Sequence, residues 1–354
     1  MRIALDAMGG DEAPKPIILG GIQAVLSQPE LQLVLVGDRA QMESHLNIDY
    51  PKDRVEIFHC TQTIDMHDSP LEAMRKKPDN SISRCWQLLA EKKVDAIVSA
   101  GNTGAMVGGG FKARKFLPKL RRPGIATLMP TANLSSNNPS SNNPLGSAGS
   151  TSSCVLIDAG ANLDPKPIHL LQYGIMGRRY AQTVLQKENP TIGLLNVGEE
   201  ASKGNELARK TYELFHNSPL ADSFVGNVEG RDIHRGKCDV VVTDAFVGNV
   251  ILKLSEGVFE FIMKRVAEEI VAPLPSDRNQ AYQALQRIVH RYDYRTFGGA
   301  PLLGIDGICI ICHGSSDQRA IQNALTVAGN LVRNHLNDKI VTDLALLPDI
   351  SDED

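Results

Sequence analysis

The amino-acid sequence predicts an α/β protein in which helices cover a mainly parallel sheet. Short apolar runs rich in β-branched residues alternate with longer helical patterns along the whole chain, and this alternation is typical of β-α-β units. Polar, glycine-rich turns follow several of the apolar runs. In parallel sheets ligands bind beyond the carboxyl ends of the strands, so these turns are the first places to look for a site.

Hydrophobic periodicity assigns the strands and helices in chain order. Strands are expected at residues 2–7, 31–37, 54–58, 94–98, 124–128, 154–158, 191–196, 223–226, 239–243 and 308–311. Helical patterns are expected at residues 16–26, 82–91, 170–186, 200–215 and 319–336. Because helices of this length separate the strands, most strand pairs should be parallel.

Composition and charge narrow the class of protein. Of the 354 residues, 42% are hydrophobic and 22% are charged, which is ordinary for a soluble globular protein. The net charge of −4 gives no reason to expect a nucleic acid partner. No apolar run reaches the roughly 18 residues that cross a bilayer, and the chain enters a strand at once without a signal-peptide pattern. We therefore expect a cytoplasmic protein.

The six cysteines are expected to be structural. Cys309, Cys312 and His313 match the C-x-x-C-H string of c-type haem attachment. They lie, however, on an apolar run that predicts a buried strand, where alternate side chains point to opposite faces. No second C-x-x-C pair is present to complete a zinc site.

The stretch VSAGNTGAMVGGG, residues 98–110, predicts an anion site. A strand ends, a turn of small residues follows and a helix begins, and such a helix N-terminus offers free backbone N–H groups to an anion. The turn consists of Gly101, Asn102, Thr103 and Gly104. Taken alone, the stretch is equally compatible with a tight strand-to-helix connection that binds nothing.

Other expected strand ends are also polar. They bring Asp6 in LDAMGGDEAP, Asp158 and Asn162 in LIDAGANLDP, Lys203 in LLNVGEEASKGNE, Asp244, Gly248 and Asn249 in VVTDAFVGNV, and His313 in HGSS. We expect the glycine-rich turns to meet at one edge of the sheet and form a site there.

The site lacks the sequence patterns of several common chemistries. No G-x-G-x-x-G fingerprint follows a strand, no P-loop is complete, and no G-x-S-x-G elbow or convincing metal-ligand cluster is present. Amide donors and one lysine, without an obvious nucleophile, suit an enzyme that binds an anion and orients it for attack on an electrophile. We expect no cofactor and no metal.

Seven motifs occur in the order LDAMGGDEAP, VSAGNTGAMVGGG, LIDAGAN, LNVGEEASKGNE, FVGNVEGRDI, CDVVVTDAFVGNVILKLSEG and GGAPLLGIDGICIICHGSS. From residue 2 to about residue 333 they resemble the phosphate acyltransferase (PlsX) family of bacterial phospholipid synthesis. The resemblance implies a Rossmann-like α/β/α fold, similar to isopropylmalate dehydrogenase and phosphotransacetylase. It also implies transfer of an acyl group from acyl-(acyl carrier protein) to inorganic phosphate. The acyl phosphate then serves glycerol 3-phosphate acylation.

The resemblance further implies partners and residue roles. Members are cytosolic homodimers that associate peripherally with the membrane, and a downstream glycerol-3-phosphate acyltransferase is a further candidate partner. Lys203 and Asn249 match the active-site lysine and GN motif of the family and would stabilise the transition state. Phosphate would be bound by Gly101, Asn102, Thr103, Gly104 and Gly248, supported by Asp6, Asp158, Asn162, Asp244 and His313. The alternatives are a solvated helix lysine at 203, a helix N-cap at 249 and a core histidine at 313.

The chain is expected to form one catalytic domain over residues 1–340, with a division into two lobes as the alternative. Residues 132–153, rich in Ser, Asn, Pro and Gly, should form a flexible insertion because they bury little apolar surface. Residues 257–297 resemble the protruding helical hairpin of the family, which is implicated in membrane contact. Packing in the core or a dimer interface is the alternative. Residues 341–354 should form an acidic tail.

Two other functions stay compatible with the sequence. A decarboxylating dehydrogenase of related architecture would need metal-binding aspartates and a cofactor loop, neither of which we identify. A non-catalytic module that binds an acyl carrier would tolerate substitution of Lys203 and Asn249. An assay for acyl phosphate separates the expected enzyme from the dehydrogenase, and the effect of substituting these two residues separates it from the module.

Overall fold

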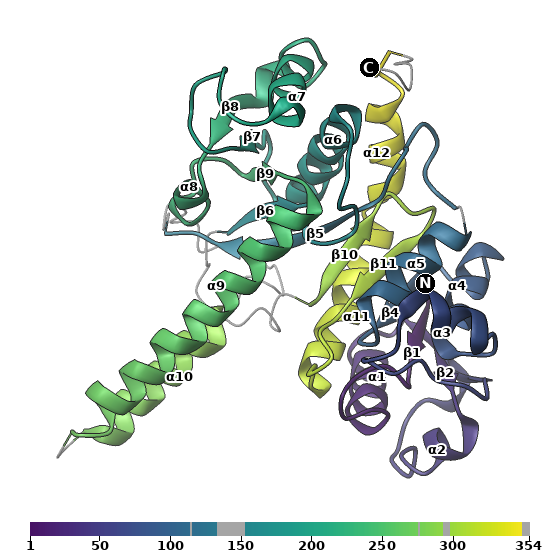
Figure 1. Ribbon diagram of the computed structural model, residues 1–354. Helices are drawn as coiled ribbons and strands as arrows, with labels where there is room; N and C mark the ends of the chain where they lie inside the picture. Colours follow the sequence, from purple (N-terminus) through teal and green to yellow (C-terminus); the bar gives the residue numbers. More distant parts are fainter. Residues whose placement is uncertain (114, 133–152, 275–276, 293–297, 349–354) are drawn as a thin grey trace.

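An eleven-stranded sheet forms the centre of the protein (Figure 1). The computed structural model describes residues 1–113, 115–132, 153–274, 277–292 and 298–348. In order across the sheet the strands are β3 (Val55–His59), β2 (Gln32–Gly37), β1 (Arg2–Asp6), β4 (Ala96–Ser99), β11 (Ile308–Ile311), β10 (Ala300–Leu303), β5 (Gly124–Pro130), β6 (Ser153–Ile157), β9 (Val240–Val242), β7 (Ile192–Leu195) and β8 (Phe224–Val228).

The strand directions divide the sheet into two halves. β3, β2, β1, β4 and β11 are parallel to one another and form the first half. β6, β9, β7 and β8 are parallel to one another and form the second half. Between them the pairings β11–β10, β10–β5 and β5–β6 are antiparallel. These successive reversals make the two halves run in opposite directions.

The expected α/β fold with a mainly parallel sheet is confirmed. Each expected strand is present, with ends within two residues of those expected. The sequence analysis missed β10. Its short run contains Pro301, which lacks the N–H group that a central strand normally donates.

Helices cover both faces of the sheet. One face carries α1 (Lys15–Ser27), α6 (Pro167–Val184), α7 (Glu206–His216), α11 (Gln318–Arg333) and α12 (Leu336–Leu344), which share one apolar core across both halves. The other face carries α3 (Pro70–Lys76), α4 (Ser81–Ala90) and α5 (Thr103–Ala113) over the first half. A smaller apolar cluster lies between α8 (Gly230–Arg235) and the second half. Short helices are α2 (Arg39–Glu43) and single turns at Lys52–Arg54 and Ala221–Ser223.

Glycines allow α5 to pack tightly against α4. A Cβ atom on Gly109 would lie 2.3 Å from the ring of Trp86, and one on Gly110 would lie 3.1 Å from it. Trp86 is buried, so its ring has little room to move away. This packing fixes α5 at the carboxyl end of β4.

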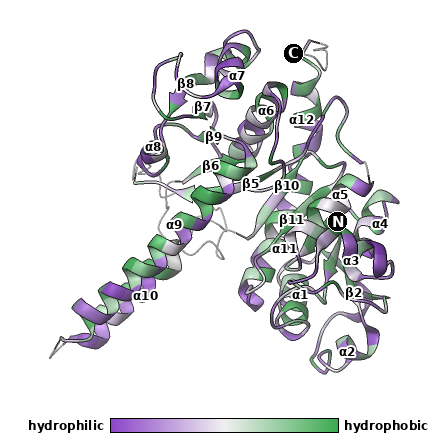
Figure 2. Ribbon diagram, viewed as in Figure 1, coloured by the Kyte–Doolittle hydropathy of each residue, from purple (hydrophilic) through white to green (hydrophobic). Residues whose placement is uncertain are grey.

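α9 (Ala245–Val266) and α10 (Arg278–Tyr292) project from the body as the expected helical hairpin (Figure 1). α9 continues through a π-helical turn at Ala267–Val271. Along α9 the side chains of Leu254, Phe261 and Ile262 are 63%, 59% and 46% exposed, so this row does not pack in the core. Figure 2 shows that apolar residues gather toward the root of α9 and hydrophilic ones toward the tip. In the described ranges no helix is both long and apolar enough to cross a membrane.

The helix expected at residues 200–215 begins later than predicted. The Asn205 side chain accepts a hydrogen bond from the N–H of Ala208 at 2.9 Å and caps α7, which starts at Glu206. Gly204 precedes the cap with φ of +89°, a conformation that ends any helical run. Lys203 therefore lies in the loop between β7 and α7, and the helix-lysine alternative is wrong.

Two of the expected segments, residues 341–354 and residues 132–153, belong only in part to the described residues. α12 runs across residue 341, where the acidic tail was expected to start, and Leu344 and Leu347 are buried. Of the expected insertion at 132–153, only the two end residues belong to the described part of the chain.

The prediction of structural cysteines is confirmed. All six are buried and none is paired. Cys309 and Cys312 face opposite sides of the sheet, since they join different apolar clusters. Burial raises the pKa of the Cys60, Cys238 and Cys312 thiols to about 12, which keeps them protonated and unreactive.

Candidate active site

The polar turns gather into two groups instead of one. Asp6, the Gly101–Gly104 turn and His313 follow β1, β4 and β11, which are neighbours in the first half of the sheet. Asp158 and Lys203 follow β6 and β7, which flank β9 in the second half. Because the two halves run in opposite directions, these carboxyl ends point in opposite directions. The expectation that all the turns meet at one edge is wrong.

Asp6 ties the loop after β1 to the loop after β4. Its buried carboxylate accepts hydrogen bonds from Ser99 Oγ at 2.7 Å and from the N–H of Met8 at 3.1 Å. Ser99 Oγ in turn accepts from the N–H of Gly101 at 3.0 Å. A Cβ atom on Gly9 would lie 2.6 Å from Asp6 Oδ2, so the loop after β1 requires glycine there. Burial raises the pKa of Asp6, whose carboxyl supports the loops and is closed to solvent.

Asn102 fixes the start of α5. Its Oδ1 accepts from the N–H of Ala105 at 3.0 Å, which caps the helix. Its Nδ2 donates to the carbonyl oxygens of Asp65, Met66 and Asp68 at 3.2–3.3 Å. The side chain is buried and fully engaged. It holds the segment before α3 against the turn, and any anion must meet the backbone instead.

Thr103 and Gly104 supply that backbone. They are the first two residues of α5, and such N–H groups have no partner within their own helix. Both residues are exposed. A Cβ atom on Gly104 would lie 2.6 Å from Cγ of Pro70, so glycine is also needed for α3 to pack on α5. The turn therefore presents two N–H donors to an anion.

His313 lies at the surface of the same group. Its Nδ1 lies 3.2 Å from the backbone N of Ser315 and 2.8 Å from Ser315 Oγ, so the ring is tied to the loop that follows it. The following carbonyl of Gly314 accepts from the N–H of Asp11 at 2.8 Å, which joins this loop to the loop after β1. Because His313 is exposed, the core-histidine alternative is wrong.

Asp158 organises the second group. Its carboxylate accepts four backbone N–H groups, from Ile125 and Gly160 at 3.0 Å, Ala161 at 2.9 Å and Asn162 at 2.8 Å. Burial nevertheless raises the pKa of Asp158 to about 6. Its role is to fold the loop between β6 and α6.

The root of α9 packs directly on this loop. Asp244 caps α9 by accepting from the N–H of Val247 at 2.9 Å. A Cβ atom on Gly248 would lie only 2.0 Å from the carbonyl oxygen of Asp158, so no other residue fits there. Asn249 is exposed in the next position, with its Oδ1 4.0 Å from where a Cβ on Gly160 would be. Since Asp244 is the cap, the N-cap alternative for Asn249 is wrong.

Two asparagines order the loop that carries Lys203. Asn196 Nδ2 donates to the carbonyl of Lys203 at 3.1 Å, and Asn227 Nδ2 donates to the carbonyl of Glu200 at 2.9 Å. The Lys203 side chain is exposed, and no ion pair joins its ammonium group to another residue of the described ranges. Because β7 and β9 are parallel neighbours, this loop lies at the same edge as Asn249.

Sequence reasoning missed the residues that shape these loops. Asn196 directly follows β7, and Asn227 lies within β8, where an asparagine is unusual enough to be a signal. No sequence pattern indicated Pro70 as a neighbour of Gly104. No three His, Cys, Asp or Glu side chains of the described chain gather as ligands for a metal ion.

The fold is one that solved structures share. Over 94% of both chains it is similar to a phosphotransacetylase from Streptococcus pyogenes, with a TM-score of 0.61 and 16% identity. It is also similar to the EutD phosphotransacetylase from Staphylococcus aureus, with a TM-score of 0.55 and 14% identity, over 98% of this chain and 94% of the other. At these identities the likeness shows a shared Rossmann-like α/β fold.

Sequence comparison then gives the family. Residues 1–339 match the family described as "Fatty acid synthesis protein". The chain is 42% identical to a phosphate acyltransferase of Halothermothrix orenii, over 95% of this chain and 96% of the relative. It is also 42% identical to a phosphate acyltransferase of Syntrophotalea carbinolica, over 99% and 96%. The chain belongs to this family, as its motifs indicated, and is an acyltransferase.

Asp158→Asn should destabilise the protein by about 1–3 kcal/mol, because the amide cannot accept from all four N–H groups. The pKa of about 6 exceeds the usual Asp value of 3.8, so the native state binds more protons and the wild type gains stability as pH falls through 6. The deficit of the variant should therefore widen between pH 7 and pH 5. Urea unfolding at both pH values measures it, and a deficit that narrows would contradict the raised pKa.

Proposed function

We propose that the protein transfers a fatty acyl group from acyl-(acyl carrier protein) to inorganic phosphate. The product, acyl phosphate, would serve the acylation of glycerol 3-phosphate in phospholipid synthesis. Family membership supports the transfer of an acyl group to phosphate. The observation that carries the proposal is the pair of N–H groups on Thr103 and Gly104 that have no partner within α5, because they suit a phosphate nucleophile.

The chemistry needs no covalent enzyme intermediate. A phosphate oxygen attacks the thioester carbonyl carbon and gives a tetrahedral oxyanion. The oxyanion collapses, the C–S bond breaks, and the thiolate of the carrier takes up a proton. Phosphate is already largely dianionic at neutral pH, so what the protein must supply is position and positive potential.

Lys203 and Asn249 are our candidates for stabilising the oxyanion. Both side chains are exposed at one edge of the second half. Lys203 lies on the loop that Asn196 and Asn227 hold in place, and Asn249 lies in the first turns of α9, which pack on the loop organised by Asp158. On the α3–α5 face, Leu252 of α9 packs against the apolar cluster of the first half. The root of α9 therefore borders the same face as α5, which supports a shared substrate between the two groups.

We further propose a cytoplasmic homodimer with peripheral membrane contact. The exposed apolar row on α9 supports a partner surface, since isolated exposed rows of this length are rare on monomers. Leu252, nearer the root of α9, packs against the buried core, and the tip of the hairpin is hydrophilic (Figure 2). This arrangement favours a second copy as the first occupant of the row. A downstream glycerol-3-phosphate acyltransferase would receive the acyl phosphate.

The first test traps acyl phosphate with hydroxylamine after incubation with acyl-(acyl carrier protein) and phosphate. The wild type should form it, and Lys203→Ala should lose about 100-fold or more in kcat, because an oxyanion donor and a charge are lost together. Lys210→Ala, another exposed lysine, is the matched control and should be unaffected. More than about a third of the wild-type kcat in Lys203→Ala would make Lys203 a surface lysine.

A second test replaces Phe261 and Ile262 together by Glu. If a second copy covers the row, the variant should sediment as a monomer, and Glu260→Gln on the same turn should remain a dimer. Flotation with anionic vesicles measures membrane contact in parallel. A variant that stays dimeric and binds vesicles like the wild type would refute both assignments for this row.

A further inference from the structure

An apolar groove of about 770 Å³ lies between α3 and α5. Its walls are Leu71, Met74, Pro78 and Phe111. Leu71 stands at its lip with 74% of its surface exposed and packs against little else. A volume of this size is in the range of small-molecule pockets, roughly 300–1,000 Å³.

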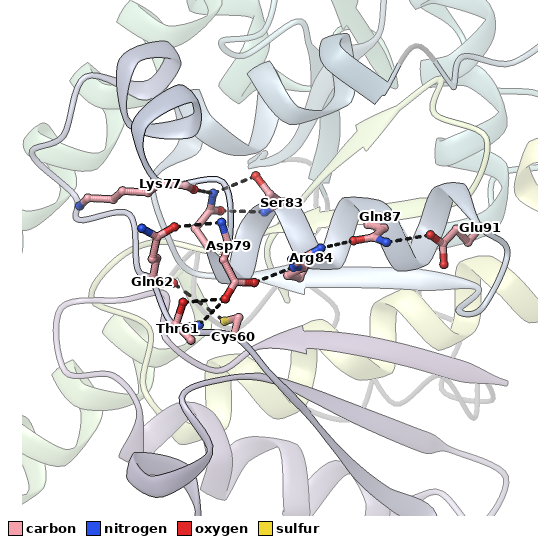
Figure 3. A network of polar contacts seen from close by, with 10 residues as sticks. Cys60, Thr61, Gln62, Lys77, Asp79, Ser83, Arg84, Gln87 and Glu91 are labelled. Carbon is pink, nitrogen blue, oxygen red and sulfur yellow. Dashed lines mark hydrogen bonds and ion pairs between the residues drawn. The ribbon is translucent and has the colours of Figure 1, made fainter.

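A polar network fixes the segment that carries Pro78 (Figure 3). The carboxylate of Asp79 accepts from the N–H and Oγ1 of Thr61 at 2.9 and 2.6 Å, and from Arg84 Nε at 2.8 Å. Gln62 Oε1 accepts from the N–H of Asp79 at 2.9 Å. The hydrogen bonds from Thr61 and Arg84 lower the pKa of Asp79 to about 2, so the carboxylate stays charged and the network is intact at neutral pH. These hydrogen bonds therefore hold Pro78, which lines this end of the groove, in a fixed position.

The groove begins one helical turn beyond the proposed phosphate turn. Gly104 and Gly108 lie one helical turn apart on the same face of α5. Gly104 contacts Pro70, the first residue of α3, and Gly108 faces Leu71 and Met74, farther along the same helix. The groove lining therefore starts at Gly108 and Leu71, about one helical turn from the N–H groups of Thr103 and Gly104 and beyond the contact between Gly104 and Pro70.

Gly108 differs from its neighbours because packing does not require it. A Cβ atom there would meet nothing closer than 3.5 Å, an ordinary contact, whereas Gly104 and Gly109 have no room for one. Glycine inside a helix destabilises it by about 1 kcal/mol relative to alanine. What Gly108 provides is an open groove floor.

We propose that this groove holds the hydrocarbon chain of the acyl donor, with the thioester carbonyl at the Thr103–Gly104 turn. The proposal rests on the acyl transfer function proposed above. It accounts for the apolar walls, the open floor at Gly108 and the start of the groove one helical turn from the Thr103–Gly104 N–H groups. The exposed residues Arg75 and Lys112 line the groove with their aliphatic stems while their charges stay in water. Each methylene buried there should strengthen binding about fourfold.

The test compares palmitoyl- and butyryl-(acyl carrier protein) as donors, with thiol release as the readout. Gly108→Leu fills the floor and should lower kcat/KM for the palmitoyl donor about tenfold or more, while the butyryl donor stays within about twofold. Gly108→Ala should act weakly, and Gly230→Leu, at the exposed first residue of α8 with open space around it, should act on neither donor. An equal loss on both donors, or no loss, would overturn the proposal.

Two further measurements keep the outcome clear. Leu71→Asp changes the exposed lip without disturbing the core, so it should shift the same donor ratio even if Gly108→Leu fails to fold. If the wild type forms acyl phosphate from neither donor, the proposed function fails, and fluorescence titration with cis-parinaric acid tests the groove by itself. Wild type that binds this fatty acid no better than Leu71→Asp would overturn the groove assignment.

Discussion

The reversal of strand direction through β11, β10, β5 and β6 determines how the rest of the molecule is arranged. It produces two parallel halves whose polar carboxyl ends point in opposite directions. The apolar core runs without a break on the α1–α6–α11 face, which holds the halves together. On the opposite face the apolar side chains form two separate clusters. On that face α5 follows the first group of polar loops and α9 follows the second.

Within each group the buried residues shape the loops, and the exposed ones are those that we propose to contact the substrate. The side chains of Asp6, Asn102 and Asp158 form hydrogen bonds to groups of their own loops and of neighbouring loops. Thr103, Gly104 and Lys203 are exposed beside these ordered loops. A preorganised site of this kind needs little reorganisation when charge develops on the reacting carbonyl.

Much of the fold followed from local patterns. The buried strands are short and β-branched, so their positions could be predicted to within two residues. Their directions could not be predicted, because an apolar run looks the same in a parallel and in an antiparallel pair. β10 was not predicted, because a proline such as Pro301 is unusual in a central strand. Because the strand directions were not predicted, the expectation that all the polar turns lie at one edge of the sheet is wrong. The start of α7 was misplaced because Asn205 was not recognised as its cap.

The candidate residues were predictable by type, and their contacts were not. The motif around Asn102 indicated an anion site, yet only the structure shows that its amide is engaged by residues 65–68. Gly248 was expected near the substrate, whereas its contact with the Asp158 carbonyl explains the glycine through packing. His313 could not be placed, because the HGSS string fits a buried or an exposed loop equally well.

The central claim is that backbone N–H groups at the start of α5 bind phosphate, and titration calorimetry with inorganic phosphate tests it directly. Proline is tolerated at the first position of a helix, so Thr103→Pro removes one of the two N–H groups without breaking α5. We predict phosphate binding weakened about tenfold or more in Thr103→Pro and unchanged in Thr103→Ala, which keeps the N–H group. Wild-type affinity in Thr103→Pro, with binding lost in Lys203→Ala, would place phosphate in the other group and contradict the claim.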